Sequence, residues 1–305
     1  MKNIYIILIF IFSFTIFSCA KKSDTSSTST TSSPSHVAVG SSGSILTSSD
    51  GTSWDNRTSG TTNHLYGVTY GNGTFMIVGD SGTILTSSDG TTWTSRTSGT
   101  SYGLLGVTYG NNTFVSVGFS GTVLTSSDGT SWDNRTSGTT IHLQGVTYGN
   151  GTFVTVGLTG TILTSSDGTT WTSRTSGTSE NLQGVSYGNG LFVSVGDSGT
   201  ILTSSDGTTW TSRSGASDAL KEVTYGNSTF VAVGNSGTIL TSSDGVTWTS
   251  RTSGTSDKIR EVTYGNSTFV TVGDNGTILT STDGTSWTSR TSGTTETLYD
   301  VTYKE

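Results

Sequence analysis

The chain has 305 residues with 14 basic and 21 acidic side chains, so its formal net charge is −7. This acidic balance argues against a nucleic-acid-binding protein, which would need a basic surface. Only 30% of the residues are hydrophobic and 42 are glycine, a composition that by itself would indicate low complexity or disorder. The order of the residues must therefore decide whether the chain folds.

The first residues predict export. Lys2 precedes an apolar run from Ile4 to Phe17, which has the length of a signal-peptide core and is too short to span a bilayer comfortably. The run ends at a Ser-Cys pair that resembles the lipobox of bacterial lipoproteins, and Cys19 is the only cysteine. The resemblance implies a signal peptide at residues 1–18 and lipidation of Cys19. An unpaired thiol, a thiol paired between chains and a transmembrane anchor are the alternatives.

A Ser/Thr-rich segment follows at residues 19–35 and contains the only proline. It lacks the apolar residues that folding requires, so we interpret it as a flexible tether. Ala20 follows the cysteine in place of an aspartate, which in lipoproteins of this kind implies the outer membrane. The expected location is the bacterial cell envelope, with the protein held at the membrane by its lipid anchor only.

The remaining chain is a repeat. Its tryptophans recur every 39 residues, with one interval of 38, at Trp54, Trp93, Trp132, Trp171, Trp210, Trp248 and Trp287. A fixed period near 40 residues is typical of propeller blades or solenoid units.

One unit divides into four short strands rich in β-branched and aromatic residues, expected at 105–109, 113–117, 122–125 and 132–136. Gly-Asn turns between the first two strands favour a tight hairpin, because these residues tolerate positive φ. No helical period is present in the mature chain. Four antiparallel strands per unit fit a blade better than a solenoid.

The repeat region begins and ends inside a unit, and this offset predicts that the ring closes. Residues 36–39 correspond to the second strand of a unit, and residues 298–303 correspond to the first strand. One blade is then built from both ends, which covers the exposed sheet edges. We predict an all-β, seven-bladed propeller of four-stranded antiparallel blades over residues 36–305.

The link before each tryptophan is nearly invariant, as in Ser-Ser-Asp-Gly-Thr-Thr-Trp at 87–93. The aspartate can accept hydrogen bonds from its own turn, and the tryptophan can cover the hairpin. A catalytic or calcium-binding role is the alternative, but a catalytic site would occur once and not in every unit. We assign to stability Asp50, Asp89, Asp128, Asp167, Asp206, Asp244 and Asp283, together with the seven tryptophans.

This hairpin resembles the Asp box, or bacterial neuraminidase repeat, of sialidases, some glycan hydrolases and propellers similar to photosystem II stability and assembly factors. The resemblance covers residues 36 to 305. The usual box has one more residue between aspartate and tryptophan. The box is a folding element in those families, which agrees with the structural assignment.

No catalytic constellation is evident, so we expect a protein that is not an enzyme and uses no cofactor or metal. Sialidases of this kind use three arginines, a tyrosine with a glutamate, and an acid, all from non-equivalent positions. Here seven arginines occupy the same place in every unit, on the outermost strand, and cannot converge: Arg57, Arg96, Arg135, Arg174, Arg213, Arg251 and Arg290. We interpret them as a solvated edge, with anionic glycan binding as the alternative. The histidines, His36, His64 and His142, are interpreted as exposed loop residues.

The units differ from one another mainly in two links, from strand four to the next blade and from strand two to strand three. Both links should emerge on one face, and loops on a rigid scaffold often carry recognition. Early blades offer apolar and aromatic side chains there, and later blades offer charges such as Asp218, Glu222, Asp257, Glu261, Glu296 and Asp300. The candidate binding residues are His64, Tyr66, Tyr102, Leu105, Phe119, Ile141, His142, Leu158, Lys221, Lys258, Arg260 and Tyr299.

These patterns predict a surface-tethered, monomeric binding or assembly scaffold whose partner is a protein or a carbohydrate. A sialidase-like glycoside hydrolase and a structural coat protein are the alternatives. Neutral drift of the loops would also explain their divergence.

Overall fold

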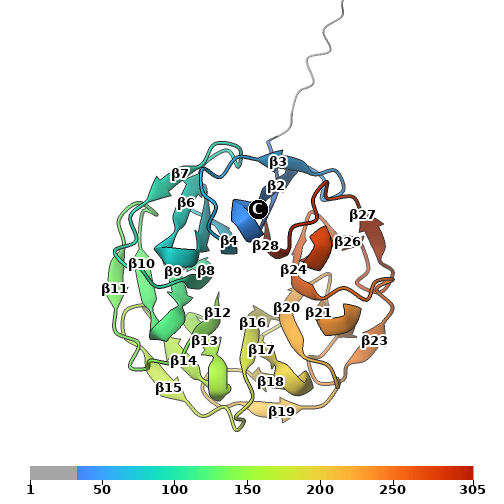
Figure 1. Ribbon diagram of the computed structural model, residues 1–305. Helices are drawn as coiled ribbons and strands as arrows, with labels where there is room; N and C mark the ends of the chain where they lie inside the picture. The colour runs from blue at the N-terminus through green and yellow to red at the C-terminus, as the bar shows by residue number, and fades with distance from the viewer. Residues whose placement is uncertain (1–32, 305) are drawn as a thin grey trace, which may run out of the picture. The chain divides into compact units, whose positions relative to one another are not determined.

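The computed structural model describes residues 33–304, which form seven four-stranded antiparallel sheets around a central channel (Figure 1). The signal peptide, Cys19 and most of the tether lie outside the described residues. No helix within 33–304 is long and apolar enough to cross a membrane. The predicted all-β propeller of seven blades is confirmed.

Each blade runs from an innermost to an outermost strand. The first blade combines β28 (Leu298–Tyr303) with β1 (His36–Gly40), β2 (Ile45–Ser48) and β3 (Asp55–Arg57). The next three are β4 (Leu65–Gly71), β5 (Thr74–Gly79), β6 (Ile84–Ser87) and β7 (Thr94–Arg96); β8 (Leu104–Gly110), β9 (Thr113–Gly118), β10 (Val123–Ser126) and β11 (Asp133–Arg135); and β12 (Leu143–Gly149), β13 (Thr152–Gly157), β14 (Ile162–Ser165) and β15 (Thr172–Arg174).

The last three blades are β16 (Leu182–Gly188), β17 (Leu191–Gly196), β18 (Ile201–Ser204) and β19 (Thr211–Arg213); β20 (Leu220–Gly226), β21 (Thr229–Gly234), β22 (Ile239–Ser242) and β23 (Thr249–Arg251); and β24 (Ile259–Gly265), β25 (Thr268–Gly273), β26 (Ile278–Ser281) and β27 (Thr288–Arg290). The fourth strand of each blade is shorter than predicted, because the tryptophan belongs to the hairpin before it.

The strands are set by local chemistry. Between β4 and β5, Asn72 and Gly73 both have positive φ, 47° and 74°, which is the backbone of a tight antiparallel hairpin. Each complete innermost strand also carries a register shift near its start, as between Leu65 and Gly67. This bulge re-aims the residues that follow it toward the channel.

Ring closure depends on pairing between the two ends of the repeat region. Strand β28 pairs antiparallel with β1, with Val37 opposite Thr302 and Ala38 opposite Val301. Beyond the strands, the amide of Lys304 donates to the carbonyl of Ser35 at 2.7 Å. The predicted sharing of one blade by both ends is confirmed.

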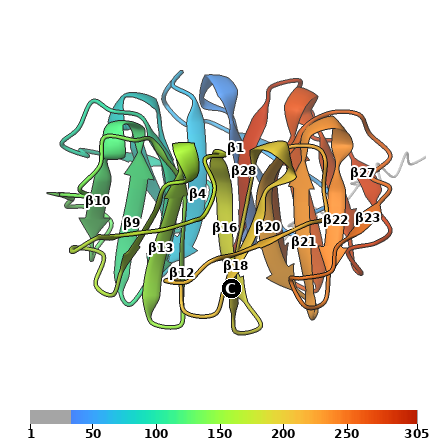
Figure 2. The same ribbon diagram turned by 90° about the horizontal axis from the view of Figure 1, so that it is seen from below.

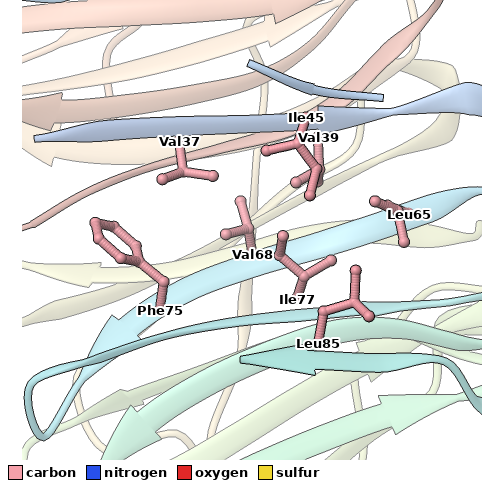
Figure 3. Close-up of a cluster of buried hydrophobic side chains, with 8 residues drawn as sticks. All are labelled: Val37, Val39, Ile45, Leu65, Val68, Phe75, Ile77 and Leu85. Carbon is pink, nitrogen blue, oxygen red and sulfur yellow. The ribbon is translucent and has the colours of Figure 1, made fainter. Parts of the chain in front are cut away.

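The hydrophobic core lies between neighbouring blades. Figure 3 shows one such cluster, in which Val37, Val39 and Ile45 of the first blade face side chains of the next blade. All members are at most 5% exposed. The second blade contributes Leu65, Val68, Phe75, Ile77 and Leu85. Because each blade is buried by its neighbours on both sides, no blade can bury its apolar residues alone.

The hairpins between the third and fourth strands, called the Asp-box hairpins here for the resemblance noted in their sequence, are held by their own side chains. In the fourth blade, Asp167 Oδ1 accepts the amides of Thr169 and Thr170 at 2.8 and 3.0 Å. The indole of Trp171 donates to the carbonyl of Gly168 at 3.0 Å. These hydrogen bonds to the charged form hold the pKa of Asp167 well below its ordinary value. The geometry supports the structural assignment of this aspartate.

Replacing Asp167 with alanine should lower the free energy of unfolding by about 1 kcal/mol, because two backbone donors lose their acceptor, as at a helix N-cap. Since the lowered pKa means that the folded state favours the carboxylate, the difference from wild type should be largest above pH 3.8 and shrink as the pH falls below it. Chemical denaturation at several pH values measures this. Asp133→Ala, which removes only an exposed ion pair with Arg135, is the matched control and should cost less. Equal effects of the two substitutions would contradict the assignment.

Candidate functional site

The two variable links meet on one face of the ring. Each link from strand two to strand three begins with a short 3-10 turn, as at Asp80–Gly82 and Phe119–Gly121. The first amide of each turn donates to the carbonyl of the preceding link, as Asp80 does to His64 and Phe119 to Gly103, both at 2.9 Å. Figure 2 shows these turns together at one end of the strands, with the tight hairpins at the other end. We call the two ends the variable face and the Asp-box face.

The variable face opens into the central channel, a cavity of about 410 Å³ lined by the innermost strands. One residue from each blade surrounds its mouth. This mouth ring consists of Tyr66, Leu105, Gln144, Gln183, Lys221, Arg260 and Tyr299. Five of these were candidate residues from the sequence, so the structure brings those five to one opening.

Aromatic side chains of the mouth ring gather where the first and second blades meet. The rings of Tyr66 and Tyr299 lie 5.0 Å apart, and His64 lies 6.1 Å from each. The guanidinium of Arg260 lies 5.0 Å from the centre of the Tyr299 ring, within cation–π range. Burial and the nearby Asp80 carboxylate raise the pKa of Tyr66 to about 12. The cluster is thus a platform of rings with a neutral phenol and a fixed cation.

Most charged side chains on the other half of the variable face form ion pairs or hydrogen bonds with one another. Lys221 lies 3.4 Å from Asp197, which also accepts a hydrogen bond from Gln183 at 3.1 Å. Arg260 contacts Asp274 at 2.5 Å. Burial and the neighbouring Arg260 lower the pKa of Lys258. The expected charged arc is present, but much of its charge is already neutralised by these pairs.

The other candidate residues lie farther out from the channel. Phe119 packs on His142 with ring centres 4.9 Å apart. Tyr102 is 52% exposed and lines a separate groove beside Arg135. Ile141 and Leu158 are half-buried and join neither aromatic pair. The predicted surface therefore consists of a channel mouth and separate outer contacts.

His64 and His142 lie in loops, as expected, but neither they nor His36 are exposed. His64 and His142 are half-buried, and the Nδ1 atom of each accepts a backbone amide, from Ser42 and Ser120. His36 is fully buried in β1. The sequence placed His36 in a strand but did not show that its side chain faces the core.

Below the mouth ring, four blades carry glycine and three carry an acid at the same register position. Gly67, Gly106, Gly145 and Gly184 occupy it in the second to fifth blades. Glu222, Glu261 and Asp300 occupy it in the other three, and we call them the acidic trio. Each accepts the amide of the next residue, and Asp300 also accepts the amide of Val68 at 2.7 Å.

The channel walls shift the titration of the trio. Desolvation raises the pKa of Glu222 to about 8 and that of Asp300 to about 7. The pKa of Glu261 is also raised well above its ordinary value, by desolvation and by the charges of the other two acids. The three groups therefore keep their protons to higher pH than exposed carboxyl groups do. The sequence showed acids at these positions, but the repeat alone could not show that they share a channel.

Metal-ligating side chains and the repeated arginines are two further candidates for a site within residues 33–304. No group of three His, Cys, Asp or Glu side chains in this part of the chain is placed to hold a metal ion. The seven arginines lie on seven separate outermost strands, where each Nε donates to a threonine hydroxyl, as Arg174 does to Thr164 at 2.8 Å. They do not converge on a common point.

Comparison with known proteins supports the fold. No protein-family model and no curated protein matches the chain. Among solved structures, YCF48 bound to D1 peptide is similar at 20% identity and a TM-score of 0.61, covering 74% of this chain and 80% of that one. YCF48 from Cyanidioschyzon merolae is similar at 15% identity and 0.59, covering 79% and 95%. The computationally designed Ika8 protein is similar at 13% identity and 0.64, covering 87% and 89%. Identities this low establish the fold alone.

The acidic trio should make the protein less stable as the pH rises. Because the folded state raises these pKa values, its stability is greatest below the ordinary carboxyl range and falls as the pH passes through 7 to 8. Glu222→Gln, Glu261→Gln and Asp300→Asn together should remove this loss, which we expect to be on the order of 2 kcal/mol given the partial exposure of the channel.

Denaturant midpoints measured between about pH 5 and pH 9 test this. Asp133→Asn, on the exposed edge, should leave the pH slope as in wild type. A triple variant with the wild-type slope would show that the trio does not carry the effect.

Proposed function

We propose that this protein is a non-enzymatic, surface-tethered binding or assembly scaffold that captures a polypeptide on its variable face. The observation that carries the proposal is the concentration of differences between the units on that face. The seven units repeat the same core and the same Asp-box hairpins, and differ most in the mouth ring and the links around it. Neutral drift of these links is the alternative, and the capture experiment below separates it from recognition.

The chemistry of the face suits a protein partner. Tyr102 and the aromatic platform of Tyr66 and Tyr299 supply the large, rigid side chains that often dominate protein interfaces. The paired charges around them can fix the orientation of a partner without leaving a strongly charged surface. A similar propeller is bound to D1 peptide, which is consistent with a polypeptide ligand here. A carbohydrate is the alternative ligand.

The path of the chain gives the scaffold an orientation. Strand β1 begins at the Asp-box face, where Ser35 bonds to the carbonyls of Ser48 and Ser49 at 2.9 and 3.0 Å. A tether leading from a lipidated Cys19 would therefore join the ring at this face. Such an anchor leaves the variable face free to meet partners away from the membrane.

Tyr66→Ala, Tyr102→Ala and Phe119→Ala in one full-length chain should reduce partner capture by at least about tenfold, because they remove the exposed and half-buried anchors of the face. Affinity capture from intact cells and their surroundings measures this, with thermal unfolding of the variant as a check on folding. Val246→Ala is the matched control, since Val246 is 41% exposed and lies in an Asp-box hairpin. Undiminished capture by a folded triple variant would overturn the proposal, and turnover of a glycan panel by wild type would favour a hydrolase.

Cys19→Ala should move the protein from the membrane fraction to the soluble fraction of the cell envelope, because a single acylated cysteine is the proposed anchor. Fractionation followed by mass spectrometry of the N-terminal peptide measures both position and lipid. Ser18→Ala, which keeps a small residue before the cysteine, is the control. An unmodified Cys19 in wild type would exclude the lipid anchor.

A further inference from the structure

The blade that closes the ring differs from the other six at one buried position. Six blades place a phenylalanine at the start of the second strand, each fully buried: Phe75, Phe114, Phe153, Phe192, Phe230 and Phe269. The closing blade has His36 there, also with 0% exposure. The register agrees, since His36 lies opposite Ser48 as Phe75 lies opposite Ser87.

The imidazole of His36 packs like the phenyl ring of the other blades, but it has two polar nitrogen atoms that phenylalanine lacks. Its ring centre lies 5.0 Å from that of Tyr303 and 6.2 Å from that of Trp54, close to the 4.7 and 6.4 Å that separate Phe75 from Tyr70 and Trp93. Nδ1 is bonded to the hydroxyl of Ser35 at 2.9 Å. Nε2 is buried and has no hydrogen-bond partner among the described residues.

A proton on this ring would be poorly accommodated. In a protonated imidazole both ring nitrogens are hydrogen-bond donors, and each needs an acceptor when the ring is buried. Nε2 of His36 has no acceptor among residues 33–304. The titratable groups that face the ring are the carboxylate of Asp50, from the Asp-box hairpin, and the phenol of Tyr303, from β28. Burial lowers the pKa of His36 to about 4, and Asp50 only partly offsets this.

We propose that His36 makes the closing blade an acid-sensitive latch, so that mild acid releases β28 from β1 while the other six blades stay paired. In the six blades with phenylalanine the covalent hairpin between the first two strands would limit any such opening. In the closing blade, β28 and β1 are joined by hydrogen bonds and packing without a connecting turn. The one blade without this hairpin is thus also the one with a histidine in place of the buried phenylalanine.

The direction of the effect follows from linkage. The neutral ring is favoured in the closed blade, so its contribution to closure is complete above the ordinary histidine pKa of 6.5 and is lost as the pH falls from there toward 4. The acidic trio acts in the opposite direction throughout this range, and one of its members, Asp300, lies in β28 itself. Comparing wild type with His36→Phe at the same pH separates the two effects, because both proteins contain the acidic trio.

Hydrogen exchange of the full-length chain, expressed as protection relative to intrinsic rates, tests the latch. The protection of β28 in wild type, divided by its protection in His36→Phe at the same pH, should fall by more than about tenfold between pH 6.5 and about pH 5, while the same ratio for β24 changes little. Phe192→His, the matched control in a blade whose first two strands are joined by a hairpin and whose core cluster does not include the closing blade, should leave β28 as in wild type.

Two results would overturn the proposal: equal protection of β28 in wild type and in His36→Phe across this range, or an ordinary titration of His36 near pH 6.5 in the folded wild-type protein. The second measurement, by NMR of the imidazole, needs no variant and stays decisive if His36→Phe fails to fold.

Discussion

Pairing between β28 and β1 is the interaction on which the rest of the molecule depends. It joins residues from opposite ends of the repeat region and leaves every innermost strand beside a neighbour on each side. The core consists of clusters shared between adjacent blades, so an unclosed ring would expose the apolar side of two blades at once. The free energy gained by burying those two sides keeps the ring closed.

The two faces of the ring divide the work of folding and recognition. On the Asp-box face, each hairpin satisfies its own amides through one aspartate and one serine, as Asp167 and Ser165 do. The hydrogen bonds of these turns are thus local, while their tryptophans pack on the core between blades. On the variable face, the 3-10 turns hold the links in place through backbone bonds that do not depend on side-chain identity. The side chains there can change from blade to blade without loss of the fold.

The sequence predicted the blades, their strands and the closure, because the tryptophan period and the Asn-Gly turns are local signals and the phase of the two ends is visible in the repeat. It also placed the mouth-ring candidates on one face. It could not predict which of them touch: Tyr66 and Tyr299 come from opposite ends of the repeat and meet only because the ring closes. The position of the acidic trio in the channel depends on the bulges of the innermost strands, and the burial of His36 depends on which side of β1 faces the core. Packing decides both, and the repeat pattern does not show them.

The repeat region begins with the second strand of a blade and ends with the first strand, and this arrangement also has a genetic consequence. Because neighbouring units are so alike, a crossover between the coding segments of two units would delete or add one whole unit of 38 or 39 residues. Because the segments that form the shared blade flank the repeated units, such an event would change the number of blades without altering the pairing of β28 with β1. Rings of different size, with channels of different width, are therefore accessible to this lineage in single steps.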